Sequence, residues 1–203
     1  MKIILASKSP ARKRILEKLG ISFSVVPSYI DEDQILDPIP SRRVKKLAKL
    51  KAKTVLKKAH ETELVIISAD TMVYMPKSKA KNLQSRFIGK PNNLTEAKQI
   101  LQSLSGSIHF LYSGLCVVWR KNGIVRQFLT YAKTKMTFRK ISDEEIDKYI
   151  KQENVLTFAG AYSIESNRPG VGFIKKMEGS YTNVVGLPIE KLKTILKKVK
   201  IIN

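Results

Sequence analysis

Residues 64–74 read LVIISADTMVY, and this stretch decides the fold of the chain. Its first four residues are apolar and mostly β-branched, which predicts a short buried strand. We expect Asp70 to end that strand. A carboxylate in such a place must be paired by its neighbours or serve a chemical purpose, because an unpaired buried charge is costly. The pattern favours a chemical role for Asp70, and the alternative is a carboxylate that only ties down the turn after the strand.

The segment before this strand, residues 41–60, repeats apolar residues at helical spacing and therefore predicts a helix. At about 100° per residue, Lys51 falls in the middle of the apolar stripe of that helix. This position directs Lys51 toward protein or toward a cleft. The alternative is a lysine whose stem passes the edge of the core and whose ammonium group reaches water.

The N-terminal segment predicts another strand, a serine-containing loop and a helix. Residues 3–5 are apolar, residues 7–10 read SKSP, and apolar residues at helical spacing follow them. Ser9 suits the helix N-cap and Pro10 suits the first helical position. The free N–H groups of the first turn, with Arg12 nearby, would form a site for an anion. An ordinary capped helix is the alternative.

Two further features carry charge at constrained places. Residues 31–33 read DED, a cluster that is typical of a solvated turn but also suits Mg²⁺, because hard cations prefer oxygen ligands. Lys90 lies between Gly89 and Pro91, where a fixed cation can stabilise charge. A solvated loop lysine is the alternative for Lys90.

The remaining sequence predicts ordinary elements. Asn122-Gly123 joins two long β candidates in a hairpin, and Ser142 with Glu145 predicts a capping box at the start of a helix. A last helix is expected from Pro188. Short strands are expected at residues 23–26, 159–165, 172–177 and 183–185, and a polar loop at residues 76–86.

The composition limits the class of protein. The chain of 203 residues carries 38 Lys and Arg against 17 Asp and Glu, and its net charge of +21 favours polyanionic partners. Much of this charge lies in residues 42–58 and 191–200, where we expect solvated helix faces. No window is apolar for long enough to span a membrane and the N-terminus lacks a secretory signal, so a cytoplasmic location is expected. Cys116 lies in an apolar run and is expected to be a core thiol.

A series of short motifs resembles the Maf family of nucleoside triphosphate pyrophosphatases. The motifs occur in the order of the family from the first strand to the last helix. Each is weak alone, whereas the ordered set across nearly the whole chain is highly specific. They are LASKSPARKRILEKLG, the Asp31-Glu32 pair, LAKLKA, SADT, IGKP, LSGS, AGAY and GSYTNVVGLP.

The resemblance implies an α/β fold, an elongated mixed sheet flanked by helices that form two lobes around a central cleft, similar to inosine triphosphate pyrophosphatases. It implies a single domain over residues 1–203 and metal-dependent hydrolysis of a nucleoside triphosphate to the monophosphate and pyrophosphate, as nucleotide-pool housekeeping. The metal would be Mg²⁺ or Mn²⁺, held by Glu32 and Asp70. The residues expected to act in catalysis are Arg12, Lys51, Asp70 and Lys90, and those expected to bind substrate are Ser7, Ser9, Ala11, Lys13, Thr71 and Glu165.

The specificity positions mix two patterns within the family. Thr71 resembles members that act on thymidine and uridine triphosphates, Glu165 resembles members that act on 7-methylguanosine triphosphate, and Ala11 fits neither group. A carboxylate only accepts hydrogen bonds, so Glu165 suits the N1–H and amino edge of guanine or the amino group of cytosine. The preferred base therefore stays open between dTTP, UTP or CTP and 7-methylguanosine triphosphate.

A different class of function competes with the enzyme. The net charge would also suit a basic nucleic-acid-binding or division-regulating protein without hydrolase activity. Against this, the chain has no helix-turn-helix spacing, zinc ligands or aromatic RNA-binding signature, so nucleic acid is not expected as a partner. A nucleotide substrate is expected, a membrane is not, and a homodimer stays open.

Overall fold

The computed structural model describes residues 1–32, 35–77, 85–166 and 172–202. The chain forms two compact units, and it passes from one unit to the other several times along its length. The first unit consists of Met1–Thr71, Tyr112–Ala132 and Ser180–Asn203, and the second of Met72–Leu111 and Lys133–Gly179.

The first unit contains a sheet with the strand order β2-β1-β3-β5-β6. Strand β1 pairs in parallel with β2 on one side and with β3 on the other. Strands β3, β5 and β6 are long and continue into the second unit. The strands are β1 (Lys2–Leu5), β2 (Ser24–Val25), β3 (Leu64–Met75), β5 (Ile108–Lys121) and β6 (Ile124–Phe138).

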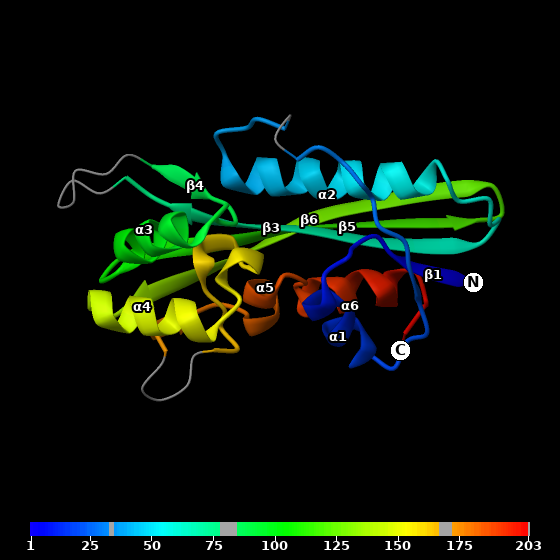
Figure 1. Ribbon diagram of the computed structural model, residues 1–203. Coiled ribbons are helices and arrows are strands. Elements are labelled where there is room, and N and C mark those ends of the chain that lie inside the picture. The colour runs from blue at the N-terminus through cyan, green and yellow to red at the C-terminus, as the bar shows by residue number, and fades with distance from the viewer. Residues whose placement is uncertain (33–34, 78–84, 167–171, 203) are drawn as a thin grey trace. The chain divides into compact units, whose positions relative to one another are not determined.

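Helices cover both faces of this sheet. Helix α2 (Pro40–Leu56) lies on one face, and α1 (Pro10–Glu17) and α6 (Ile189–Lys198) lie on the other (Figure 1). Alternate residues of β3 pack into the hydrophobic clusters on the two faces of the sheet, because successive side chains of a strand point to opposite faces. Ile66 packs with Ala48 and Ala52 of α2, whereas Ile67 packs in the other cluster, with Leu16 of α1.

The second unit adds edge strands and a helix pair. Strand β4 (Arg86–Ile88) pairs antiparallel with β3, and β7 (Ile174–Glu178) pairs antiparallel with β6. Helices α3 (Leu94–Leu104) and α4 (Asp143–Gln152) lie side by side (Figure 1), joined by an ion pair of 2.6 Å between Lys98 and Asp147. Two single 3₁₀ turns follow, at Val155–Thr157 and Ala159–Ala161.

Several helix starts, one hairpin turn and the burial of one cysteine agree with the predictions from the sequence. The Ser9 side chain accepts a hydrogen bond from the Arg12 backbone N–H at the start of α1, and Pro10 takes the first helical position. The predicted capping box is present at the start of α4. Asn122 and Gly123 both have positive φ angles, 49° and 74°, as a tight hairpin between β5 and β6 requires. Cys116 is fully buried, as expected.

Three predicted elements are wrong. Asp70 does not end its strand, because β3 runs on to Met75 and pairs there with β4. Residues 159–165 form no strand, since the turn at Ala159–Ala161 contains Gly160 with a φ of 77°. Residues 183–185 belong to the short helix α5 (Tyr181–Val185), because the Ser180 side chain caps it and overrides the β-branched pair.

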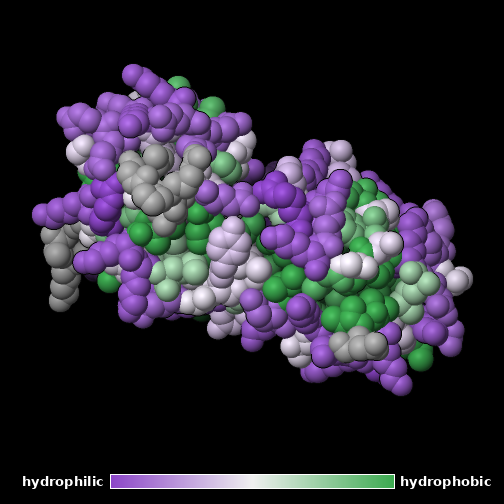
Figure 2. All heavy atoms as spheres, turned by 90° about the horizontal axis from the view of Figure 1, so that it is seen from below, coloured by the Kyte–Doolittle hydropathy of each residue, from purple (hydrophilic) through white to green (hydrophobic). Residues whose placement is uncertain are grey.

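The fold class predicted from the sequence is confirmed: the seven strands within the described residues form a mixed sheet flanked by helices. The Lys-rich runs lie on exposed helix faces, as Lys49 and Lys53 do on α2 and Lys193 does on α6. Figure 2 shows hydrophilic side chains across much of one face of the molecule. None of the described helices combines the length and the apolarity that crossing a bilayer requires. The prediction of a single domain over the whole chain stays a prediction.

Candidate active site

The candidate site lies in the first unit, where β1 ends and β3 continues. Strand β1 pairs with β3 through Leu5, which lies opposite Ile67, and the Ala6 N–H adds one more bond to the Ile67 carbonyl at 2.8 Å. The chain then leaves the sheet through the SKSP loop and enters α1. The part of β3 that carries Asp70 therefore passes beyond the carboxyl end of its parallel neighbour, which is where α/β sheets usually bind ligands.

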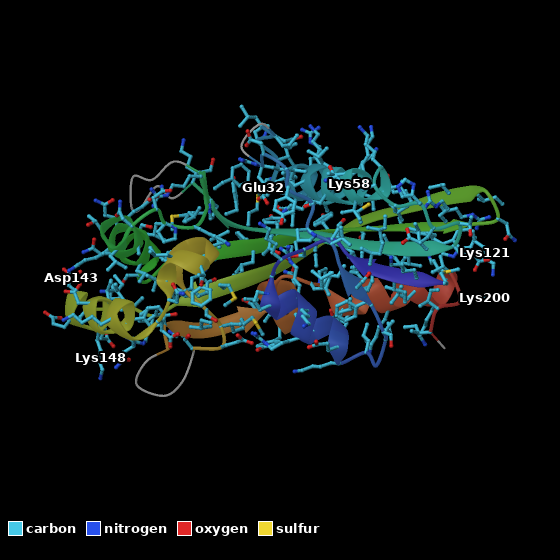
Figure 3. The ribbon with its side chains drawn as sticks, turned by 45° about the vertical axis from the view of Figure 1, so that its right-hand side comes forward. Glu32, Lys58, Lys121, Asp143, Lys148 and Lys200 are labelled. Atoms are coloured by element: carbon cyan, nitrogen blue, oxygen red, sulfur yellow. The ribbon has the colours of Figure 1, made fainter. Side chains whose placement is uncertain are left out.

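A buried lysine joins two carboxylates at this place. The Nζ atom of Lys51 lies 2.6 Å from Oδ1 of Asp70 and 2.7 Å from Oε1 of Glu32. Lys51 and Asp70 are only 7% and 3% exposed, so their charges are largely removed from water. Figure 3 shows Glu32 on the loop that precedes α2. The predicted inward direction of Lys51 is thus correct, and its ammonium group lies within the protein.

Close packing of α2 on the sheet allows this contact. A Cβ atom at Gly114 of β5 would lie 2.1 Å from the Val44 carbonyl oxygen, so only glycine permits this approach of strand and helix. The hydroxyl of Ser68 donates to the Ala48 carbonyl at 2.7 Å. Ser68 and Asp70 are two residues apart on β3 and therefore face the same helix.

Burial controls the protonation of Asp70. Removal from water raises the pKa of the Asp70 carboxyl, and the nearby charge of Glu32 adds to this. The ammonium group of Lys51 and the guanidinium group of Arg12 lower the same pKa and oppose the shift. A carboxylate with a raised pKa is a better proton acceptor than an ordinary aspartate, so Asp70 is suited to act as a general base.

Arg12 is held on the other side of β3. Its Nε–H donates to the Gly186 carbonyl at 2.8 Å, Nη1 donates to the Ser7 hydroxyl at 3.1 Å, and Nη2 donates to the Thr71 hydroxyl at 3.3 Å. The Ser7 hydroxyl also accepts from the Ser9 backbone N–H at 3.2 Å, which closes the loop before α1. Burial lowers the pKa of Arg12, while Asp70 and Glu32 raise it.

The structure brings together most, but not all, of the residues expected at the site. Those gathered in the first unit are Ser7, Ser9, Arg12, Glu32, Lys51, Asp70 and Thr71. Lys13 is exposed on α1, and its Nζ lies 3.7 Å from a carboxylate oxygen of Glu17. Ala11 is half-buried on the same helix. Asp33 lies outside the described residues.

Lys90 and Glu165 belong to the second unit. Lys90 is exposed and follows Gly89, whose carbonyl accepts a hydrogen bond from Gly160 at 2.9 Å. Glu165 is also exposed, and its backbone N–H donates to the Ser163 hydroxyl at 3.1 Å. Their roles toward a substrate stay predictions.

Sequence reasoning missed two residues that contact the gathered side chains. Ser113 on β5 shares a hydrogen bond of 2.7 Å with Thr71, and Gly186 accepts from Arg12. Gly186 lies in the motif GSYTNVVGLP, which contained a signal for it. Ser113 has no local signal, because its partners lie far away in the sequence.

The carboxylates of the site fit a divalent cation. The oxygens of Glu32 and Asp70 converge on one cationic group, the ammonium of Lys51. Mg²⁺ is commonly held by one or two carboxylates together with substrate phosphates, so these two oxygen donors suit it. Within the described residues, no group of three or more acidic, histidine or cysteine side chains gathers at one place.

The family model and the relatives of known sequence agree on one family. The model of the Maf-like proteins matches residues 2–199. The dTTP/UTP pyrophosphatase of Treponema denticola is 40% identical, covering 97% of this chain and 96% of its own, and that of Thermoanaerobacter sp. is 40% identical, covering 98% and 96%. A solved dITP/XTP pyrophosphatase from Mycobacterium abscessus aligns with 70% of this chain and 76% of its own, at 16% identity and a TM-score of 0.40. The match over nearly the full length means that the chain belongs to the Maf-like family.

Proposed function

We propose that this chain is a nucleoside triphosphate pyrophosphatase, which hydrolyses its substrate to the nucleoside monophosphate and pyrophosphate in the cytoplasm. The relatives named as dTTP/UTP pyrophosphatases support the activity, because they are 40% identical over nearly the whole chain. The observation that carries the proposal is the buried contact of Lys51 with Asp70 at the end of β1. Burying such a pair is costly, and a fold that only needed packing would be better served by apolar residues there.

The charges of the site suit a triphosphate. In the proposed reaction, water attacks the α-phosphorus and pyrophosphate leaves. Lys51 and Arg12 would neutralise phosphate oxygens, and Lys90 would contribute a third positive charge. The first turn of α1 presents backbone N–H groups at the positive end of the helix dipole, which favours a phosphate.

Asp70 is the residue proposed to act on water. Its carboxylate would orient the attacking molecule and accept a proton from it, and its raised pKa favours this role. Glu32 and Asp70 would hold Mg²⁺ or Mn²⁺, and such an ion supplies charge neutralisation for the phosphates. Lys51 contacts both carboxylates and keeps them at one place before a substrate arrives.

For the base, we propose a pyrimidine nucleoside triphosphate, on the strength of the dTTP/UTP pyrophosphatases to which the chain is similar. Glu165 favours a second candidate, 7-methylguanosine triphosphate, because a carboxylate accepts from the donor edge of guanine. The same carboxylate could accept from the amino group of CTP but offers no donor to the carbonyl groups of thymine or uracil.

Pyrophosphate release tests the proposal. The full chain is incubated with Mg²⁺ or Mn²⁺ and a panel of dTTP, UTP, CTP and 7-methylguanosine triphosphate. We expect pyrophosphate and monophosphate in equal amounts, and loss of both in Asp70→Asn. Asp37→Asn is the matched control, because Asp37 is also buried and also contacts a lysine, Lys46 at 2.7 Å, on α2. If no triphosphate were cleaved and duplex DNA bound tightly at physiological salt, the nucleic-acid-binding alternative would replace this proposal.

A further inference from the structure

We infer that Thr71 and Ser113 form a hydroxyl relay that positions Arg12 for the phosphates, so that Thr71 acts as a positioning residue and not as a reader of the base. The inference rests on the proposed function and adds to it. Three segments build the relay: β3 carries Thr71, β5 carries Ser113, and the C-terminal segment around α5 carries the carbonyl groups of Asn183 and Gly186.

The direction of each hydrogen bond in the relay follows from its last member. The Asn183 carbonyl can only accept, so Ser113, whose Oγ lies 2.9 Å away, donates its single proton to it. Ser113 must then accept from Thr71, whose Oγ1 lies 2.7 Å away. Thr71 has now used its only proton and is an acceptor for Nη2 of Arg12 at 3.3 Å. The relay therefore runs from Arg12 through Thr71 and Ser113 to the Asn183 carbonyl.

This direction leaves Thr71 with no proton to offer to a base. Its hydroxyl lies 3.4 Å from the Gly186 carbonyl as well, but the shorter contact to Ser113 takes the proton. Thr71 also follows Asp70 on β3, so the two side chains point to opposite faces of the sheet. Asp70 contacts α2, while Thr71 faces α1 and α5 through Arg12 and Gly186.

The relay fixes one edge of the Arg12 guanidinium group and leaves donors over. Hydrogen bonds to Gly186, Ser7 and Thr71 occupy three of its five N–H groups. One N–H on each terminal nitrogen is left by these bonds, and a guanidinium group binds phosphate oxygens through such N–H groups. Because the guanidinium is planar, fixing Nε and one N–H on each terminal nitrogen also fixes the direction of the other two.

Burial and close packing make this arrangement rigid. Ser113 and Asn183 are fully buried, so the Ser113 hydroxyl and the Asn183 carbonyl cannot bond to water. Either group would have no hydrogen bond in place of the one between them if that bond were broken, which is costly. A Cβ atom at Gly186 would lie 3.2 Å from Nε of Arg12 and 3.3 Å from Oγ1 of Thr71. Gly186 also has a φ of 111°, which side chains rarely allow, so the carbonyl that receives Arg12 needs glycine.

A double-mutant cycle tests the relay. Thr71→Val keeps the shape of the side chain and removes its hydroxyl, and we expect kcat/KM for pyrophosphate release to fall about tenfold. The fall should be the same for UTP, CTP and 7-methylguanosine triphosphate, and Thr71→Ser should restore the rate. In an Arg12→Ala background, Thr71→Val should change kcat/KM less than about twofold. Thr54→Val is the matched control, since the half-buried Thr54 hydroxyl only donates to the Leu50 carbonyl within α2.

A loss that differs between bases, or that persists in the Arg12→Ala background, would overturn the relay. A second measurement does not depend on catalysis: the exchange of the Arg12 Nε–H with water, followed by NMR and assigned with Arg12→Lys. We expect slow exchange in the parent and at least about tenfold faster exchange in both Thr71→Val and Ser113→Ala. Unchanged exchange in a folded Ser113→Ala would contradict the relay even if the parent released pyrophosphate. If both variants exchanged faster than a parent that cleaves no triphosphate, the relay would be supported and the proposed function would be rejected.

Discussion

Two buried polar clusters in this protein, one in each unit, are built on opposite principles. In the first unit, the buried side chains of Lys51 and Asp70 form an ion pair, and Lys51 also contacts Glu32, whose side chain is 54% exposed. In the second unit, His109 is fully buried, and its Nε2 shares a hydrogen bond of 2.8 Å with the hydroxyl of Tyr162. Burial lowers the pKa of His109 to about 3, so the ring is neutral at physiological pH.

The surroundings of the two clusters explain this difference. The ring of His109 meets the ring of Phe138 edge-on, with centroids 4.7 Å apart, and Tyr162 packs against the same Phe138 at 4.8 Å. A neutral polar pair in such an aromatic box contributes packing and one hydrogen bond. The Lys51 cluster instead places charges where their removal from water is costly. We propose that the Lys51 cluster is retained because its charges act on a ligand, whereas the His109 cluster contributes to stability.

Removing the charge of Lys51 should have the largest effect. We expect Lys51→Met to lower kcat/KM for pyrophosphate release about 100-fold, because the variant loses the positive charge that we propose acts on the reacting phosphates. Steady-state rates with UTP would measure this. Lys49→Met is the matched control, since Lys49 is an exposed lysine on the same helix. Equal losses in the two variants would mean that net charge alone matters, and the buried position would then have no catalytic meaning.

Acid should destabilise the protein through His109. Its pKa in the folded state is about 3, whereas the unfolded chain takes up the proton near the ordinary value of 6.5. The free energy of unfolding should therefore be unaffected by this group above pH 6.5 and fall by about 1.4 kcal/mol per pH unit below it. Urea unfolding between pH 7 and pH 5 would measure the slope, where the folded ring still holds no proton.

The variant His109→Gln should lose this contribution to the slope. The exposed His60 on the loop after α2 gives the control, His60→Gln, which should keep the slope of the parent. If the parent and the His109→Gln variant had the same pH dependence, burial would not keep the His109 ring neutral in the folded protein.

Deleting the hydroxyl of Tyr162 should have a moderate effect. Tyr162→Phe leaves Nε2 of His109 buried without its partner, so we expect a loss of about 1–2 kcal/mol in the free energy of unfolding. The urea midpoint at pH 7 would report this. Tyr181→Phe, at an exposed tyrosine, should leave the midpoint unchanged. If the Tyr162→Phe variant were as stable as the parent, the hydrogen bond between His109 and Tyr162 would contribute nothing to the stability of the protein.

Lys13 should have the smallest effect. It is exposed on α1 and lies 3.7 Å from Glu17, an i,i+4 contact worth about 0.3–0.5 kcal/mol. We expect Lys13→Gln to change the free energy of unfolding by no more than that and to change KM for UTP less than about threefold. A much larger rise in KM would support the role in substrate binding that the sequence predicted for Lys13.

The sequence predicted those site residues whose signal is local. Lys51 interrupts an apolar helical stripe, and the structure buries it. Ser9 and Pro10 correctly predict the start of α1, and Asn122-Gly123 correctly predicts the hairpin. In each case the neighbouring residues alone decide the conformation, which is why a pattern over a few positions was sufficient.

The misses share a different cause, because they depend on contacts between distant segments. Strand β3 continues past Asp70 since β4 pairs with its far end, and nothing within residues 64–74 states this. Ser113 meets Thr71 across 42 residues, and Gly186 meets Arg12 across 174. Such hydrogen bonds leave no periodic pattern in the sequence, so only the fold reveals them.

The fate of the oxygen atom from the attacking water shows which phosphorus atom is attacked. The full chain hydrolyses UTP with Mg²⁺ in water enriched in a heavy oxygen isotope, and mass spectrometry follows the label in the two products. We expect one labelled oxygen in UMP and none in pyrophosphate, because in the proposed reaction water activated at Asp70 attacks the α-phosphorus. Label in pyrophosphate, or label in UMP at an undiminished rate in Asp70→Asn, would contradict it.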